Sequence, residues 1–149
     1  GKIDAAISYP PYSKQLLRTD AQIIFSSRQF PNTIFDVLAV RSDRISSHGA
    51  ALSALVSGHL RGLEHLRTNR EDALRRIAAR RELSLEEAEA SYRGLHLPAL
   101  SDNRRLLAPV GALLKAAKTL NTLMHGSGLM AKPDTLTGLV SANFLPPEA

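Results

Sequence analysis

The side chains best suited to holding a small molecule lie near the start of the chain. Tyr9 ends an apolar run and is fixed by Pro10, so its ring could stack on a planar ligand while its hydroxyl donates a hydrogen bond. Ser26 and Ser27 offer hydroxyls and backbone amides that suit an anion or a carbonyl group. Arg28 suits a carboxylate, a sulfonate or a phosphate. The structural alternatives stay open: a core tyrosine with its tip in water, serines that form a turn, and a surface arginine.

Asp36 is the one carboxylate in the apolar run 34–40. A carboxylate inside an apolar strand costs several kcal/mol unless it is paired or solvated. We therefore expect Asp36 to face a cleft or a partner. That partner could be a ligand amine or a protonated ring nitrogen, and an internal backbone amide or arginine is the structural alternative.

Catalytic and metal chemistry find little support in the sequence. The chain has no cysteine, which excludes disulfides, thiolate metal sites and cysteine nucleophiles. His59 and His65 are six residues apart and do not share a helix face well, and no zinc-hydrolase motif is present. The run Gly126-Ser127-Gly128 follows a helical pattern and lacks the lysine of a phosphate-binding loop. We expect a protein that is not an enzyme and holds no cofactor and no metal.

Three short runs near the N-terminus predict the β-strands that would position these groups. They cover residues 3–9, 21–25 and 34–40, and their apolar side chains would face both sides of a buried sheet. Between the first two runs, residues 12–18 predict a brief helix with Leu16 and Leu17 inward, and Tyr12 on the turn is expected to be a packing residue. A strand-helix-strand order implies parallel pairing with a right-handed crossover.

From Ser46 onward the apolar period becomes helical. Thr68-Asn69 can end the first long helix and cap the next one. Ser84 with Glu87 three residues later is a start signal of the capping-box type. Ser101 or Asp102 can cap a helix over residues 101–123, in which Pro109 predicts a bend or is an early-turn residue. The predicted fold class is α/β and predominantly helical, with three short strands followed by about five helices, over residues 51–66, 70–81, 84–92, 101–123 and 133–140.

These motifs, in this order, resemble a known family. The resemblance is to the C-terminal half of the periplasmic solute-binding proteins of the nitrate, sulfonate, taurine and thiamine-precursor type, which serve ABC importers. It extends over essentially the whole chain, through the helix pair around Asn69 and the segment Ser84-Leu85-Glu86-Glu87. The residues that carry it most directly are Asp4-Ala5-Ala6, Tyr9-Pro10-Pro11-Tyr12, Ile24-Phe25-Ser26-Ser27, Phe30-Pro31 and the run Ile34 to Arg41.

The resemblance implies part of a type II periplasmic-binding fold, in which two lobes close on a small ligand. Residues 1–25 would end lobe two, residues 26–33 would form the hinge, and residues 34–149 would complete lobe one. It also implies solute binding for ABC-type import, the membrane permease as a partner, and a periplasmic location with the signal peptide absent from this sequence. Exposed sheet edges would favour a homodimer.

Two other function classes remain open from the sequence. One is a ligand-sensing domain of a signalling protein, which would keep the binding fold. The other is a basic helical module that binds nucleic acid, because the net charge is +5 and arginines recur along the helices. Acidic residues interrupt those arginines and stacking aromatics are missing from the helical part, so we expect no nucleic-acid partner. The arginines concerned are Arg61, Arg67, Arg70, Arg75, Arg76, Arg80, Arg81, Arg104 and Arg105.

Overall fold

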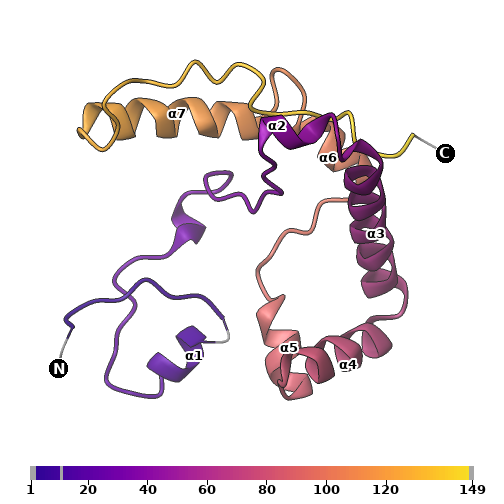
Figure 1. Cartoon of the computed structure of the whole chain (residues 1–149). Coiled ribbons are helices and arrows are strands. Elements are labelled where there is room, and N and C mark those ends of the chain that lie inside the picture. The colour runs from indigo at the N-terminus through magenta and orange to yellow at the C-terminus, as the bar shows by residue number, and fades with distance from the viewer. Residues whose placement is uncertain (1–2, 11, 148–149) are drawn as a thin grey trace. The chain divides into compact units, whose positions relative to one another are not determined.

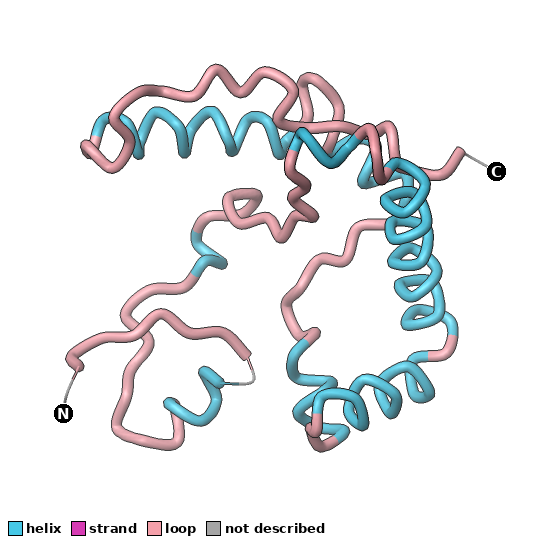
Figure 2. Tube along the Cα trace, viewed as in Figure 1, coloured by secondary structure: helices cyan, strands magenta, loops and turns pink. Residues whose placement is uncertain are grey.

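The computed structural model describes residues 3–10 and 12–147 (Figure 1). Gly1, Lys2 and Pro11, which the predictions for the opening run included, lie outside these residues. The described residues form only helices and loops (Figure 2). The elements are α1 (Tyr12–Leu16), the 3₁₀ helix η1 (Ser27–Gln29), α2 (Ser42–Ile45), α3 (Gly49–Thr68), α4 (Arg70–Arg81), α5 (Leu85–Ser91), α6 (Leu100–Leu106) and α7 (Ala112–Gly126).

The α/β fold class predicted from the sequence is therefore wrong for the described residues. Residues 3–9, 21–25 and 34–40, which we expected to be three strands, are loops without a strand in the structure (Figure 2). Their apolar side chains are exposed except for the half-buried Phe35, and Ile24 has 87% of its surface accessible. A strand is stable only when neighbouring strands satisfy its backbone groups. An apolar run indicates that a segment could form a strand, but it does not show that a second strand is present to pair with it.

The chain divides into two compact units. One contains Gly1–Ser26 with Leu63–Leu97, and the other contains Ser27–Gly62 with Pro98–Ala149. These two units do not test the lobe and hinge boundaries that the resemblance implies, and those boundaries stay a prediction.

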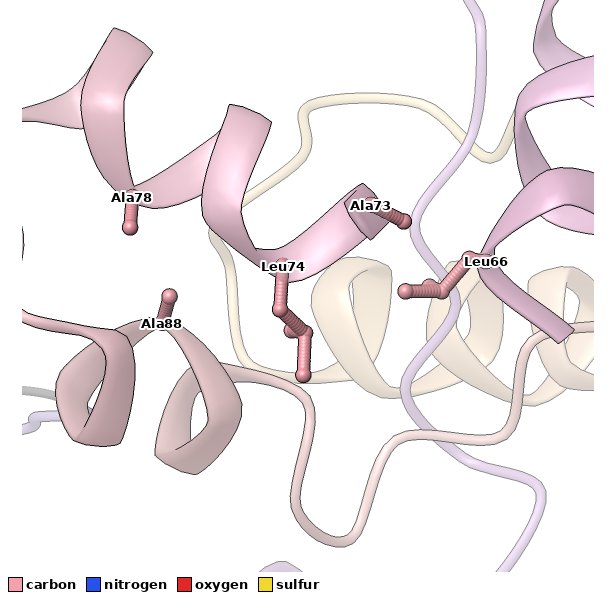
Figure 3. Close-up of a cluster of buried hydrophobic side chains, with 5 residues drawn as sticks. All are labelled: Leu66, Ala73, Leu74, Ala78 and Ala88. Atoms are coloured by element: carbon pink, nitrogen blue, oxygen red, sulfur yellow. The ribbon is translucent and has the colours of Figure 1, made fainter. Parts of the chain in front are cut away.

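The first unit is built around the packing of α4 on α5 (Figure 1). Its buried cluster unites the end of α3 with one face of α4 and one face of α5, and Ala78 faces Ala88 in the close-up (Figure 3). Alanines at the contact let two helices approach closely, while the leucines supply most of the buried apolar surface. The cluster consists of Leu66, Ala73, Leu74, Ala78 and Ala88.

The start of α5 confirms the predicted capping box. The Glu87 backbone N–H donates to Ser84 Oγ over 3.1 Å, and the Ser84 backbone N–H donates to Glu87 Oε2 over 2.9 Å. Two amides that a helix start leaves unpaired are thereby satisfied. These hydrogen bonds, from the Ser84 backbone first, hold the pKa of Glu87 below its usual range, with smaller help from the charges of Arg18 and Lys14.

This capping box gives α5 a defined pH dependence. Because the pKa of Glu87 is depressed in the folded state, its contribution is fully present above the unfolded pKa and is lost as the pH falls through the folded pKa. We expect the amides of α5 to lose protection from hydrogen exchange as the pH falls from about 5 to about 3. Glu87→Gln should flatten this dependence, because an amide oxygen still accepts the hydrogen bond and does not titrate. An unchanged dependence in that variant would assign the effect to other carboxylates.

In the second unit, α6 and α7 replace the single bent helix predicted over residues 101–123. The break contains Pro109, and Gly111 is buried against the end of α6. Neither Ser101 nor Asp102 is the N-cap, since α6 begins at Leu100 and Asp102 instead accepts a hydrogen bond from the Ala99 backbone N–H over 3.2 Å. Pro109 therefore lies at an interruption of the helix, but one helix ends and a second begins there, and no single bent helix forms.

The C-terminal segment, residues 128–147, contains no helix, so the short helix predicted over residues 133–140 is also wrong. Asn121 holds this segment on α7 by two reciprocal hydrogen bonds of 2.9 Å with the backbone of Asp134. The Asp134 carboxylate then accepts from the Leu136 N–H over 2.6 Å, which forms a local turn in place of a helical one. Farther along, Arg104 of α6 donates to the carbonyl oxygen of Pro146.

Candidate functional site

Two aromatic rings meet on the turn that leads into α1. The ring centroids of Tyr9 and Tyr12 are 6.2 Å apart and the rings cross at 82°, an edge-to-face arrangement. The Tyr9 carbonyl accepts a hydrogen bond from the Ser13 N–H over 3.0 Å, which ties the turn to the helix. Tyr9 is 71% exposed and Tyr12 55% exposed, and Pro10 between them is exposed as well. The turn thus presents aromatic surface to solvent, where a planar or apolar group can stack.

Tyr12 is a residue that the sequence interpretation undervalued. We expected it to be a packing residue of no functional interest, and it packs on Tyr9 at the surface. Leu16 and Leu17, which we expected to face inward, are exposed. The only signal in the sequence was their closeness along the chain, because the side-chain periods of helices and strands do not apply before the start of α1.

The residues of the predicted serine and arginine site lie at η1. Ser27 and Arg28 are the first two residues of this 3₁₀ helix and are exposed, while Ser26 just before it is half-buried. The Phe30 N–H donates to the Ser27 carbonyl over 3.0 Å, so the turn has its own backbone hydrogen bond. Ser26 and Arg28 both have interaction partners in the structure.

Asp36 lies in the loop between η1 and α2, and its side chain is exposed. The desolvation cost that we expected from an apolar strand therefore does not arise in this structure. An exposed carboxylate is open to solvation, so neither the ligand role nor the internal partner is needed to explain its position. A contact with a ligand stays a prediction.

The predicted site residues fall into the two units of the chain. Tyr9, Pro10 and Ser26 belong to the first unit. Ser27, Arg28 and Asp36 belong to the second. Within each unit, Tyr9 lies beside Pro10 and Ser27 lies beside Arg28 only because these residues are consecutive in the chain.

A polar cluster at the turn between α3 and α4 went unnoticed in the sequence. His65 Nε2 and Arg76 Nε both lie 2.7 Å from the same Asp72 carboxylate oxygen, Oδ2. Hydrogen bonds from Arg76 and then from His65 lower the pKa of Asp72 from its ordinary value. The signal was the helix break at Asn69, which turns residues 65 and 72 toward each other although they are seven apart in sequence.

Asn69 differs in one respect from its predicted role as the cap of α4. It makes no side-chain capping hydrogen bond, and its amide nitrogen instead lies 3.0 Å from Thr68 Oγ1 and 3.4 Å from His65 Nδ1. The amide therefore belongs to the polar cluster. Helix α4 still begins directly after Asn69, with Glu71 and Asp72 in its first turn, where negative charge is favourable.

Within residues 3–10 and 12–147, no three His, Asp or Glu side chains gather in a way that could hold a metal ion. Among the helices of the same residues, none combines the length and the apolar character that a membrane span requires. Comparison with protein-family models, with curated proteins and with solved structures gave no match to this chain. The resemblance described from its motifs consequently remains a prediction.

Proposed function

We propose that this chain binds a small organic or oxyanion solute for import by an ABC-type transporter. The observation that carries the proposal is the exposed Tyr9–Tyr12 pair, since two aromatic rings held in solvent by a proline turn are poised to contact a ligand. The motif order from Asp4 to Arg41 supports it from the sequence. The residues proposed to contact the solute are Tyr9, Pro10, Ser26, Ser27, Arg28 and Asp36.

The chemistry of these residues limits the solute. Aromatic rings favour a planar or partly apolar body, and a guanidinium with nearby hydroxyls favours an anionic group such as a sulfonate or a carboxylate. A carboxylate such as Asp36 would select an amine or a protonated ring nitrogen. A zwitterion or an amino-substituted ring could contact both the arginine with its hydroxyl neighbours and the carboxylate of Asp36. A bare oxyanion could contact only the arginine and the hydroxyls.

The proposal carries further expectations with it. The membrane permease is the macromolecular partner, and the periplasm is the location. A homodimer is a third expectation, which sedimentation at several concentrations can test. The sheet edges expected to form it are absent from the described residues, which contain no strand. A sensor role in a signalling protein would use the same ligand contacts and would differ in the partner.

The ion pairs in the structure favour the expectation that nucleic acid is not a partner. Among the residues that the structure describes, at least five of the nine helical arginines contact a carboxylate and are partly neutralised by it, which weakens the attraction for a phosphate backbone. The pairs are Arg67–Glu64, Arg70–Glu89, Arg75–Glu71, Arg76–Asp72 and Arg105–Asp102.

Titration of the ¹⁵N-labelled chain tests the proposal. The probes are nitrate, taurine, an alkanesulfonate and an aminopyrimidine, and binding is followed by amide shifts in the nuclear magnetic resonance spectrum. For the probe that binds, Tyr9→Ala should weaken affinity about tenfold, because one stacking contact contributes on the order of 1 kcal/mol. Tyr9→Phe keeps the ring and should retain most of the affinity. If none of the four probes shifts the amides around Tyr9, the proposal is wrong.

A matched pair of charge variants separates a specific contact from general attraction. Arg28→Gln and Arg61→Gln each remove one positive charge from an exposed arginine of the second unit. Affinity for an anionic probe should fall in the first variant and stay within about twofold in the second. Equal losses would show that net charge, and not Arg28, holds the anion.

A further inference from the structure

Acidic residues are missing from one long stretch of the chain. Between Asp102 and Asp134 there is no aspartate or glutamate, whereas five basic residues occur there. The rest of the chain holds equal numbers of basic and acidic residues, so this stretch accounts for the whole net charge of +5. Helix α7 and the turn that follows it lie within the stretch. The five basic residues are Arg104, Arg105, Lys115, Lys118 and Lys132.

One side of α7 is covered by the chain itself, and the opposite side is not. The C-terminal segment runs back beside the helix and is held there by the hydrogen bonds between Asn121 and Asp134 (Figure 1). Leu123 follows Asn121 by two residues, which places it about 200° farther around the helix, on the opposite side. Leu123 is 61% exposed, and Leu120 on the preceding turn is 56% exposed. Two large apolar side chains therefore face solvent on the uncovered side.

The turn after α7 adds a third exposed leucine. Gly128, with a φ of +72°, reverses the chain, and the Leu129 N–H then donates to the Met124 carbonyl over 2.9 Å. A left-handed glycine followed by a hydrogen bond back into the last turn is the Schellman arrangement, which fixes the chain at the helix end. Leu129 is thus held at the end of α7, where it is 74% exposed. We call Leu120, Leu123 and Leu129 the leucine stripe.

The lysines of α7 accompany this stripe. Lys115, Thr119 and Leu123 follow one another at intervals of four residues, so they lie along one side of the helix. Lys115 and Lys118 are exposed, and neither forms an ion pair within the part of the chain that the structure describes. A lysine stem can cover apolar surface while its ammonium group reaches a charged layer. The surface thus combines exposed leucines with positive charge that no described carboxylate pairs.

We propose that this surface of α7 lies on an anionic lipid bilayer, with the leucine stripe inserted at the level of the headgroups. Leucines on one side of a helix and lysines beside them are typical of a helix that lies in the interface plane of a membrane. The leucines are stabilised when they leave water, and the negative surface potential attracts the lysines. The proposal does not depend on the solute contacts, because the Tyr9–Tyr12 pair belongs to the other unit.

Charge complementarity favours lipid over a second copy of the chain. In a two-fold contact the same surface of both copies meets, so Lys115 and Lys118 of one copy would approach those of the other. No acidic residue between Asp102 and Asp134 is present to compensate for this repulsion. Anionic headgroups supply the missing negative charge, and fluid acyl chains can surround exposed leucines without a preformed groove.

A tryptophan reporter measures the insertion directly. The chain has no tryptophan, so Leu129→Trp introduces a single one at the end of α7. With vesicles of equal parts phosphatidylglycerol and phosphatidylcholine, its emission should shift to shorter wavelength and be quenched by brominated acyl chains. Leu55→Trp on α3, at a position of 55% exposure, should show neither effect. Unchanged emission of Leu129→Trp, or an equal shift with pure phosphatidylcholine, would overturn the proposal.

Matched substitutions separate insertion from adsorption by charge alone. Leu123→Ala should weaken partition into the anionic vesicles about tenfold, because apolar groups that would leave water are lost. Leu55→Ala makes the same change on α3 and should alter partition by no more than about twofold. Lys115→Gln should weaken it about fivefold, and Arg61→Gln on α3 by no more than about twofold. If Leu123→Ala and Leu55→Ala bind alike, the stripe does not insert and the proposal is wrong.

Two soluble anions separate a membrane from other partners. Inorganic phosphate and polyglutamate carry negative charge and offer no acyl chains, so neither should shift the emission of Leu129→Trp. A shift with polyglutamate as large as that with the anionic vesicles would assign the surface to an acidic protein and overturn the proposal. Circular dichroism should show the same helix content in every variant, since the replaced side chains are exposed.

Discussion

Replacing Leu74 with alanine is expected to lower the free energy of unfolding of the α4–α5 pair by about 2–5 kcal/mol. Leu74 is only 5% exposed and is one of two leucines in a cluster whose other buried members are alanines, with Ile77 and Tyr92 packed against it. Its removal takes away a large share of the apolar surface buried there and leaves a cavity that short alanine side chains cannot fill. Amide hydrogen exchange of α4 and α5 measures the loss directly in this unit.

Leu85→Ala is the matched control for this experiment. Leu85 is the first residue of α5 in the same unit, and it is 46% exposed. The same change in side chain should alter stability there by no more than about 0.5 kcal/mol. Similar losses in both variants would show that the cluster around Leu74 does not hold the unit together.

Gly111→Ala is expected to destabilise the junction of α6 and α7 by about 1–3 kcal/mol. A Cβ atom at this position would overlap the carbonyl oxygens of Leu106 and Arg105, which are backbone atoms at the end of α6 and cannot rotate away. The backbone φ of −67° is open to any residue, so the glycine is required by the close approach alone. Urea denaturation followed by circular dichroism measures the change.

Gly62→Ala is expected to raise stability, because no backbone atom from outside its own helix lies close to Gly62. Gly62 lies within α3, and a Cβ atom there meets nothing within 4 Å. Alanine should stabilise the helix by up to about 1 kcal/mol, since glycine is the poorer helix former. A stabilising effect of Gly111→Ala in the same assay would contradict the steric explanation.

Much of the helical part of the fold was predictable because its signals are local. The apolar period of α3 and the Ser84–Glu87 pair act within one or two turns of a helix, and both predictions are confirmed. The prediction of the strands was wrong because strand formation is not local. The run that contains Ile24 has the composition of a strand, but a strand needs a second strand from another part of the chain to pair with. The C-terminal segment failed because Asn121 and Asp134, 13 residues apart, satisfy each other's hydrogen bonds where a helix was expected.

The candidate site was predictable in its chemistry and less so in its geometry. The sequence identified Tyr9 as a stacking group, but the contact with Tyr12 needed the turn between them to be built. Asp36 shows the limit most clearly. We expected Asp36 to have a charged or hydrogen-bonding partner because we expected its side chain to be buried. In an exposed loop the carboxylate does not need such a partner. The cluster of His65, Asp72 and Arg76 depends on the direction of α4 after Asn69, which composition does not reveal.

The α4–α5 pair also has a consequence for how the chain acquires its structure. All five members of its cluster lie within residues 66–88, so the loops that close when they meet are short. Domains dominated by such local contacts fold in microseconds to milliseconds, far faster than sheets that join distant segments. During synthesis this helix pair can therefore form as soon as α5 leaves the ribosome, before α6 and α7 have left it. It is the part of the chain on which later folding events can build.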